Sequence, residues 1–496
     1  MTNNANPQEL IAWIPEAIYA GDSFESNRAL VSDTAGAIVR IASVSDLAGE
    51  KRINLPRRAL LPGLVNAHSH AFQRVLRGRT EYRTARERDS FWTWRELMYS
   101  AATRLTADDV YDASSMAFLE MALTGITAVG EFHYLHQAPD GTAYEDANLL
   151  AAEVIRAARD IGLRIALLRV AYARSGYQTE SNPRQARFIE RSSDLYLKNL
   201  EALTGSVRSP AVREGNLAGA AADTVWVGVA PHSVRAVPLT YLKDIVQFAD
   251  ERDLKVHMHV AEQPAEVSAC VAEYGRTPVA LLQTEGLLSG NFTAVHAIHV
   301  TPKAIPALAT SGAMVCACPT TERNLGDGVV PADEYLKHNV PICLGTDSHA
   351  QIDLLEDARE LEYHLRLQKL ERAVLDVRSP SVSEGNRAGA LPDDRASDTA
   401  RYLFHCATIN GARSIGSPGG ALASGQAADF FTLDLDDPSI GGASPATLLA
   451  SIIFASSRAA VREVVVAGKP IVAAGRHLNQ EDVVERFNEL QKKLWG

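Results

Sequence analysis

The chain has 496 residues, of which 46% are hydrophobic and 22% charged, so it carries enough apolar material for a large globular core. Its formal net charge is −11 and it has no sustained basic block, which argues against nucleic acid as a partner. The first residues lack a basic segment followed by an apolar run, and no stretch approaches the ~18 apolar residues of a membrane-spanning helix. The five cysteines are few and odd in number, so we expect a protein of the reducing cytoplasm without a membrane partner.

Both ends of the chain have the pattern of short strands and turns. We expect residues 1–58 and 420–478 to fold together as one small β-sandwich domain, followed by an amphipathic helix over 479–496 that packs on the surface or on a partner subunit. The strand-like stretches are AIVRIASV, ADFFTLDLD and VREVVVAGKPIVAAG, the last with a predicted turn at Gly468, Lys469 and Pro470.

Residues 59–419 alternate apolar, strand-like runs with helical stretches such as DVYDASSMAFLEMALTG and PLTYLKDIVQFADERD. Eight such units in order predict an α/β fold, a (β/α)8 barrel of parallel strands that forms the catalytic domain. The eight predicted strands are ALLPGLVNA, ITAVGEF, RIALLRVA, TVWVGVAP, KVHMHVAE, TAVHAIH, GAMVCACP and PICLGTDS.

An internal repeat interrupts this pattern. Residues 207–220 (VRSPAVREGNLAGA) and 377–390 (VRSPSVSEGNRAGA) match at 11 of 14 positions. We interpret them as two surface insertions away from the chemistry, while a pair of related binding loops stays open as the alternative.

Polar side chains gather at the predicted strand ends, where barrel active sites lie. His68 and His70 stand at i and i+2 near the end of the first strand, so they share a face. His259 ends the fifth strand and Asp347 follows the eighth. Three imidazoles and one carboxylate suit Zn²⁺, one ion per chain, and would also accept Fe²⁺.

Two further pairs of histidines required a choice. We prefer His259 over His257 as the ligand because it lies nearer the strand end and Glu262 follows three residues later. We prefer His296 over His299 as the functional residue because His296 closes its apolar run, whereas His299 lies past the strand.

Longer local stretches carry a resemblance to a known family. They are NAHSHAFQR, SFWTWRELMY, AVGEFHYLH, APHSVRAV, HVAEQPAEV, CPTTERNLGDG and LGTDSHAQIDLLEDARELEY. Over nearly the whole chain, the sequence resembles the amidohydrolase superfamily, in its branch of mononuclear-metal deaminases, and most of all the formimidoylglutamate deiminase family. The HxH, the HxxE and the aspartate are general to the superfamily, whereas FWTWRELMY and TTERNLGDG are typical of the narrower family. The two repeated segments depart from its pattern as insertions.

The resemblance implies hydrolysis of N-formimidoyl-L-glutamate to N-formyl-L-glutamate and ammonia, a step of histidine degradation. In that reaction Asp347 would ligate the metal and accept the proton of the attacking water. Glu262 would carry a proton to the leaving nitrogen, and His296 would steady the tetrahedral intermediate. By analogy with proteins of this fold, we expect a homodimer.

The expected substrate is an amidine with two carboxylates, although the protein itself is net acidic. The pocket therefore needs local cations, and Arg95 and Arg235 are the candidates because a guanidinium pairs bidentately with a carboxylate. The resemblance adds Gln73, Tyr134 and His232 as substrate-binding residues. Which arginine meets which carboxylate stays open.

Three alternatives remain. Another mononuclear-zinc aminohydrolase, such as a guanine or purine deaminase, would share the metal ligands but would not need two arginines. A binuclear amide or lactam hydrolase would need a bridging carboxylated lysine or a glutamate at the fourth strand, and VWVGVAPHS offers neither. A non-catalytic barrel would be expected to have lost metal ligands, and here none is missing.

Overall fold

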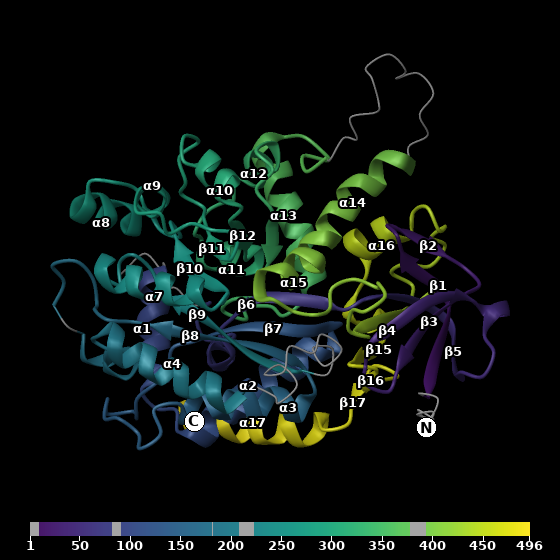
Figure 1. Ribbon diagram of the computed structural model, residues 1–496, viewed down its shortest axis with the longest axis horizontal. Coiled ribbons are helices and arrows are strands. Elements are labelled where there is room, and N and C mark those ends of the chain that lie inside the picture. Colours follow the sequence, from purple (N-terminus) through teal and green to yellow (C-terminus); the bar gives the residue numbers. More distant parts are fainter. Residues whose placement is uncertain (1–8, 82–90, 181, 208–222, 377–392) are drawn as a thin grey trace, which may run out of the picture.

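The computed structural model describes residues 9–81, 91–180, 182–207, 223–376 and 393–496, with the backbone alone over 393–398. In this part of the chain, one sheet of parallel strands forms a barrel and a second, mixed sheet lies beside it (Figure 1). The fold class predicted from the sequence is confirmed. Apart from Val207, the two repeated segments lie outside the described residues, and the domain boundaries stay a prediction.

The barrel strands follow one another in chain order around the sheet, and each predicted stretch supplies one of them. Almost every strand residue is buried, because helices cover the outside and side chains fill the inside of a parallel barrel. The strands are β6 (Leu64–Ser69), β7 (Ile126–His133), β8 (Arg164–Ala171), β9 (Val225–Pro231), β10 (Val256–Val260), β11 (Phe292–His296), β12 (Met314–Ala317) and β13 (Ile342–Leu344).

The first and last strands of the barrel meet at a seam made by the segments around Ser69 and Asp347, which form a parallel bridge. The backbone N–H of His70 donates to the carbonyl of Asp347 at 3.1 Å, and the N–H of Asp347 donates to the carbonyl of His68 at 3.0 Å. A β-carbon on Gly345 would lie 2.7 Å from the β-carbon of His68. Only glycine therefore permits this approach of the two strands.

Helices surround the barrel and connect its strands. The start of α2 follows an ordinary capping rule: the side chain of Thr106 caps the helix and forms a reciprocal capping box with Asp109. Both helical stretches predicted from the sequence form helices, α2 and α7. The helices are α1 (Phe91–Ala102), α2 (Ala107–Leu123), α3 (Leu149–Ile161), α4 (Ser193–Val207), α7 (Leu239–Glu251), α8 (Pro264–Tyr274), α9 (Pro278–Thr284), α10 (Ile305–Ser311), α11 (Pro319–Leu325), α12 (Ala332–Lys337), α13 (Leu354–Lys369), α14 (Asp393–Ala407), α15 (Ile409–Ile415) and α16 (Leu448–Ala455), with short 3-10 turns η1 (Val44–Asp46), η2 (Ala71–Leu76), η3 (Pro183–Phe188) and η4 (Arg458–Ala460).

The mixed sheet combines strands from both ends of the chain, as predicted. Strand β14 pairs antiparallel with β5, which joins the C-terminal strands to the N-terminal ones. In Figure 1 the yellow strands β15 and β16 accordingly lie beside the purple N-terminal strands. The sheet runs β17-β16-β15-β14-β5-β1-β3-β4, with β2 paired to β1. The strands are β1 (Leu10–Ala20), β2 (Ser23–Glu25), β3 (Arg28–Asp33), β4 (Ile38–Ser43), β5 (Lys51–Pro62), β14 (Phe430–Asp434), β15 (Val461–Val466), β16 (Lys469–Ala473) and β17 (Arg476–His477).

The turn between β15 and β16 falls earlier than the sequence suggested. Val466 pairs with Lys469, so the two turn residues are Ala467 and Gly468, at φ 50° and 69°. Such a two-residue turn needs positive φ at both central positions. Lys469 and Pro470, which we expected in the turn, belong to β16.

Helix α17 (Gln480–Trp495) packs on the barrel rather than standing apart. It runs beneath α2 and α3 in Figure 1, and it contacts α2. Its buried residues recur at helical spacing, at Val483, Phe487, Leu490 and Leu494, which gives one apolar face. Among the described residues, none of the helices combines the length and the apolar character that a bilayer crossing demands.

Candidate metal centre

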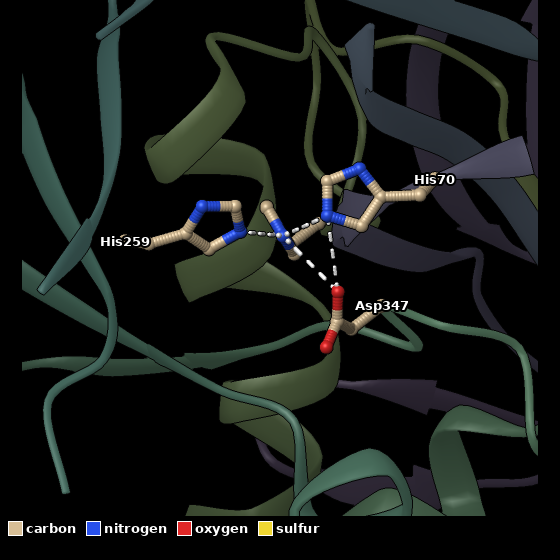
Figure 2. Close-up of side chains that lie close together, drawn as sticks. His70, His259 and Asp347 are labelled. Atoms are coloured by element: carbon tan, nitrogen blue, oxygen red, sulfur yellow. Dashed lines mark hydrogen bonds and ion pairs between the residues drawn. The ribbon is translucent and has the colours of Figure 1, made fainter. Parts of the chain in front are cut away.

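Four predicted ligands converge at the C-terminal end of the barrel. His68 and His70 come from β6 and its end, His259 from β10, and Asp347 from the segment after β13. Nε2 of His68 lies 3.2 Å from Nε2 of His70 and 3.1 Å from Nε2 of His259. An oxygen of Asp347 lies 3.2–3.4 Å from the first two of these nitrogens. Figure 2 shows His70, His259 and Asp347 turned toward one common point.

Hydrogen bonds behind the rings show why this set fits a metal ion. Nδ1 of His70 donates to the carbonyl of Phe132 at 2.9 Å, and Nδ1 of His259 donates to the carbonyl of His232 at 3.1 Å. With the hydrogen on Nδ1, each Nε2 directs a lone pair inward. Ligands about 2.0 Å from a tetrahedral zinc ion lie roughly 3.3 Å apart, which matches the spacing of these atoms. The donor set therefore fits a divalent cation with three nitrogens and one oxygen.

The charge states of the ligands agree with that fit. Burial lowers the pKa of His68 to about 3 and holds the pKa of His259 well below its usual value, so both rings are neutral and able to ligate. Burial alone would raise the pKa of Asp347, but its contacts with His68 and His70 and the positive charge of His296 outweigh burial and hold that pKa well below its usual value.

Two more predicted residues face the same point. Nε2 of His296 lies 3.8 Å from a carboxylate oxygen of Glu262 and 3.8 Å from the second carboxylate oxygen of Asp347. Burial raises the pKa of Glu262 to about 7, helped by the negative charge of Asp347. Burial alone would lower the pKa of His296, but the facing carboxylates raise it to about 10. An acid–base pair thus lies beside the ligand set, with Glu262 suited to exchange protons near neutral pH.

The five predicted substrate residues line one pocket together with ligands of the centre. They are Gln73, Arg95, Tyr134, His232 and Arg235. The side-chain amide of Gln73 donates to the hydroxyl of Tyr134 at 2.7 Å. The aromatic rings of Tyr134 and His232 pack against each other at 5.9 Å.

The two arginines of the pocket have spare hydrogen-bonding capacity. Buried Nε of Arg95 and buried Nη1 of Arg235 lack a hydrogen-bond partner within the described residues. The guanidinium of Arg95 stacks over the ring of Trp92 at 4.3 Å, which orients it without neutralising it. A buried unpaired donor is costly, so a ligand in this pocket that accepts hydrogen bonds would be favoured beside these two groups.

The histidines that we set aside lie outside the ligand set. Nε2 of His257, two residues before His259 in β10, approaches the carbonyl of Ser414 at 3.1 Å. Nε2 of His299 donates to the carbonyl of Asp327 at 2.9 Å. One nitrogen of each ring thus meets a backbone oxygen, while Nδ1 of His257 has no partner within the described residues.

Sequence reasoning missed two buried carboxylates behind the centre. Glu322 accepts a hydrogen bond from Nδ1 of His296 at 3.2 Å. Glu131 accepts from the hydroxyl of Ser69 at 2.5 Å and from the backbone N–H of Ala71. Glu131 stands within the apolar run AVGEF of β7, and Glu322 stands in α11, shortly after the apolar run of β12, in CACPTTE. An acidic residue so close to an apolar strand was the available signal.

A parallel β/α barrel with a converging set of three histidines and one aspartate at its C-terminal end defines a metal-dependent hydrolase. The model of the amidohydrolase family matches residues 59–471. The chain belongs to the amidohydrolase family and acts on C–N bonds.

Individual relatives agree with this assignment. The formimidoylglutamate deiminase of Pseudomonas aeruginosa is 35% identical over 460 residues, which cover 92% of this chain and 94% of that protein. The crystal structure of an amidohydrolase from Brucella melitensis is similar at a TM-score of 0.83 and 32% identity, covering 99% of this chain and all of that one. An adenosine deaminase from Xanthomonas campestris with bound zinc shares the fold at a TM-score of 0.78 and 22% identity, with 98% of each chain covered.

Proposed function

We propose that the protein is a zinc-dependent deiminase that hydrolyses N-formimidoyl-L-glutamate to N-formyl-L-glutamate and ammonia. One observation carries the proposal: a site for a divalent cation shares its pocket with two arginines whose buried nitrogens lack partners. The relative from Pseudomonas aeruginosa supports the same substrate.

The roles of the residues around the metal follow from their positions. His68, His70, His259 and Asp347 would hold the zinc ion, which would lower the pKa of a coordinated water toward 7, from about 15.7 in bulk water. Asp347 has one oxygen toward the ligand nitrogens and the other toward His296, so it can both ligate and accept a proton.

Proton transfer to the leaving nitrogen falls to Glu262. Its pKa of about 7 lets it take a proton from Asp347 and deliver it to the departing ammonia without a large energetic mismatch. His296 lies 3.8 Å from both carboxylates and would donate to the oxygen that the attacking water adds to the amidine carbon.

Recognition of the glutamate part falls to the arginines. Arg95 and Arg235 would each receive one substrate carboxylate, and Gln73, Tyr134 and His232 would hold the atoms between them. A purine ring carries no carboxylate and would leave both guanidinium groups unpaired, so a purine deaminase is the weaker hypothesis.

The setting of this reaction is also part of the proposal. We place the enzyme in histidine degradation in the cytoplasm, as a homodimer with one zinc ion per chain and Fe²⁺ as the alternative metal. The five cysteines are free and buried, which suits a reducing compartment. Light scattering on the purified protein would test the dimer.

One assay tests the central claim. Ammonia release is measured with metal-loaded protein and either N-formimidoyl-L-glutamate or guanine as substrate, alongside metal analysis. We expect turnover of the first substrate alone and about one metal ion per chain. Activity on guanine alone would replace the proposal with its rival, and two metal ions per chain would favour a binuclear hydrolase.

A further inference from the structure

The segment from Pro319 to Asp327, which contains α11, forms hydrogen bonds to three parts of the site: the segment after β13, Gln263 and His296. The hydroxyl of Thr321 bonds the carbonyl of Thr346 at 3.2 Å and accepts from the N–H of Ser348, next to the ligand Asp347. At its other end, the carboxylate of Asp327 accepts from the side chain of Gln263, the neighbour of Glu262. The segment therefore connects the residues that flank both proposed proton carriers.

Glu322 lies in the middle of this segment and points at His296. One of its carboxylate oxygens accepts from Nδ1 of His296 at 3.2 Å and from the backbone N–H of Cys318 at 2.9 Å. Both side chains are 1% exposed. Among the ion pairs of the described residues, His296 is the partner of Glu322, and no lysine or arginine takes that place.

The hydrogen bond from His296 to Glu322 determines which ring nitrogen of His296 points toward the other site residues. A carboxylate accepts hydrogen bonds, so the ring carries a hydrogen on Nδ1 and its Nε2 is aimed at Glu262 and Asp347. The backbone of His296 is in the left-handed region at φ 68°, where a residue other than glycine needs support from its surroundings.

We propose that Glu322 is a positioning residue of the hydrolysis: its carboxylate fixes the orientation and the Nδ1 hydrogen of His296. The inference rests on the proposed function of the site. A role limited to packing would not require an ionisable group, because an amide would cap the N–H of Cys318 equally well.

The kinetic test compares Glu322→Ala, which removes the acceptor, with Glu322→Gln, which keeps an oxygen at that place. We expect Glu322→Ala to lower kcat by about 10- to 100-fold with KM within about twofold and metal content unchanged. Glu322→Gln should recover at least part of the loss. The proposal is overturned if a folded, metal-loaded Glu322→Ala enzyme keeps its kcat. It is also overturned if KM rises by as large a factor as kcat falls.

A spectroscopic test works without substrate. Histidine labelled with ¹⁵N reports whether Nδ1 of His296 carries a hydrogen, and the resonance is assigned by its absence in His296→Gln. We expect a hydrogen on Nδ1 in the unmodified protein and a changed resonance in Glu322→Gln. A ring without that hydrogen, or an identical resonance in the variant, overturns the proposal even if Glu322→Ala does not fold.

Glu362→Gln is the matched control. Glu362 is also a fully buried carboxylate, but it lies on α13 and accepts from the backbone of Val374 and Leu375 and from Arg366. We expect it to lower stability while kcat per folded molecule stays unchanged. If the unmodified enzyme releases no ammonia from N-formimidoyl-L-glutamate, the proposed function fails, and the spectra still decide the role of Glu322.

Discussion

Asp347 shows how one side chain can combine two tasks. Its oxygens face different neighbours, one the ligand nitrogens of His68 and His70, the other Nε2 of His296. The contacts with His68 and His70 and the positive charge of His296 hold the pKa of Asp347 well below its usual value, so the carboxylate is ionised. It can therefore hold a cation and still offer a base to the reaction.

The ligand roles predict the effect of two substitutions. Asp347→Asn and His259→Ala each remove one of four ligands, and each should abolish turnover and lower the bound metal per chain. Metal analysis of the purified variants beside the ammonia assay checks both expectations. Near-normal activity in either variant would contradict the ligand set.

The arginines predict a different kinetic signature. Arg95→Met and Arg235→Met should each raise KM for the dicarboxylate by about 10- to 100-fold, since a charged hydrogen bond contributes ~1.5–3 kcal/mol. Metal content should not change. Arg156→Met, which removes an exposed arginine paired with Glu153, serves as the control with unchanged KM. Loss of metal in Arg95→Met would move that residue out of substrate binding.

At the scale of single elements, the seam between β6 and β13 shapes the metal centre. Gly345→Ala would place a methyl group within 3.0 Å of three atoms of His68, two of them backbone. Since the backbone cannot yield at little cost, the strands must separate and the ligands with them. We expect metal affinity to fall at least about tenfold, as for other losses of support around a ligand.

Metal titration of the folded variant measures this effect. Gly290→Ala is the control, because a β-carbon at Gly290 meets no atom within 4 Å. Equal metal affinity in Gly345→Ala and the unmodified protein would show that the seam can widen without moving His68.

The elements differ in how far the sequence predicts them. The barrel strands could be predicted because each is a short, mostly apolar run of strand length between helical stretches, as KVHMHVAE becomes β10 and RIALLRVA becomes β8. The turn at Ala467 was misplaced, since the Gly-Lys-Pro sequence suggests a turn more strongly than Ala-Gly does.

The residues of the site also differ in how far the sequence predicts their contacts. The ligand set follows from residues at strand ends, and the structure brings it together. The partnership of His296 with Glu322 joins residues 26 positions apart, and no local pattern encodes which carboxylate meets which nitrogen. Such contacts depend on how α11 packs over the barrel, which is a tertiary property.

On the scale of the whole molecule, a buried ion pair links the barrel to the mixed sheet. Arg164 at the start of β8 donates to both oxygens of Asp429 at 2.6 and 3.1 Å, and both side chains are fully buried. Asp429 also accepts from the N–H of Ala467 beyond β15. One carboxylate thus joins strands that are far apart in the chain.

Removing that carboxylate should destabilise the protein without touching the chemistry. Asp429→Ala removes the carboxylate that balances the charge of the buried Arg164 guanidinium, and we expect the free energy of unfolding to fall by about 3–5 kcal/mol. Denaturant unfolding measures the loss, while kcat per folded molecule stays unchanged. Asp436→Ala breaks the exposed pair with Arg57 in the same sheet and should have little effect. A similar loss of unfolding free energy in both variants would show that the buried ion pair stabilises the protein no more than the exposed one.

The seam has a consequence for the life of the enzyme in a cell. Three of the four ligands sit on the two edges that close the barrel, so an ion held there would act as a clasp between the first strand and the last. Ligand binding stabilises the folded state by mass action, by about 4 kcal/mol at a thousandfold excess over Kd. When the metal ion is scarce, a barrel without bound metal would open more often at this edge and would be cleaved by proteases more quickly. A shortage of the metal ion would then lower the number of enzyme molecules and also leave the remaining ones inactive.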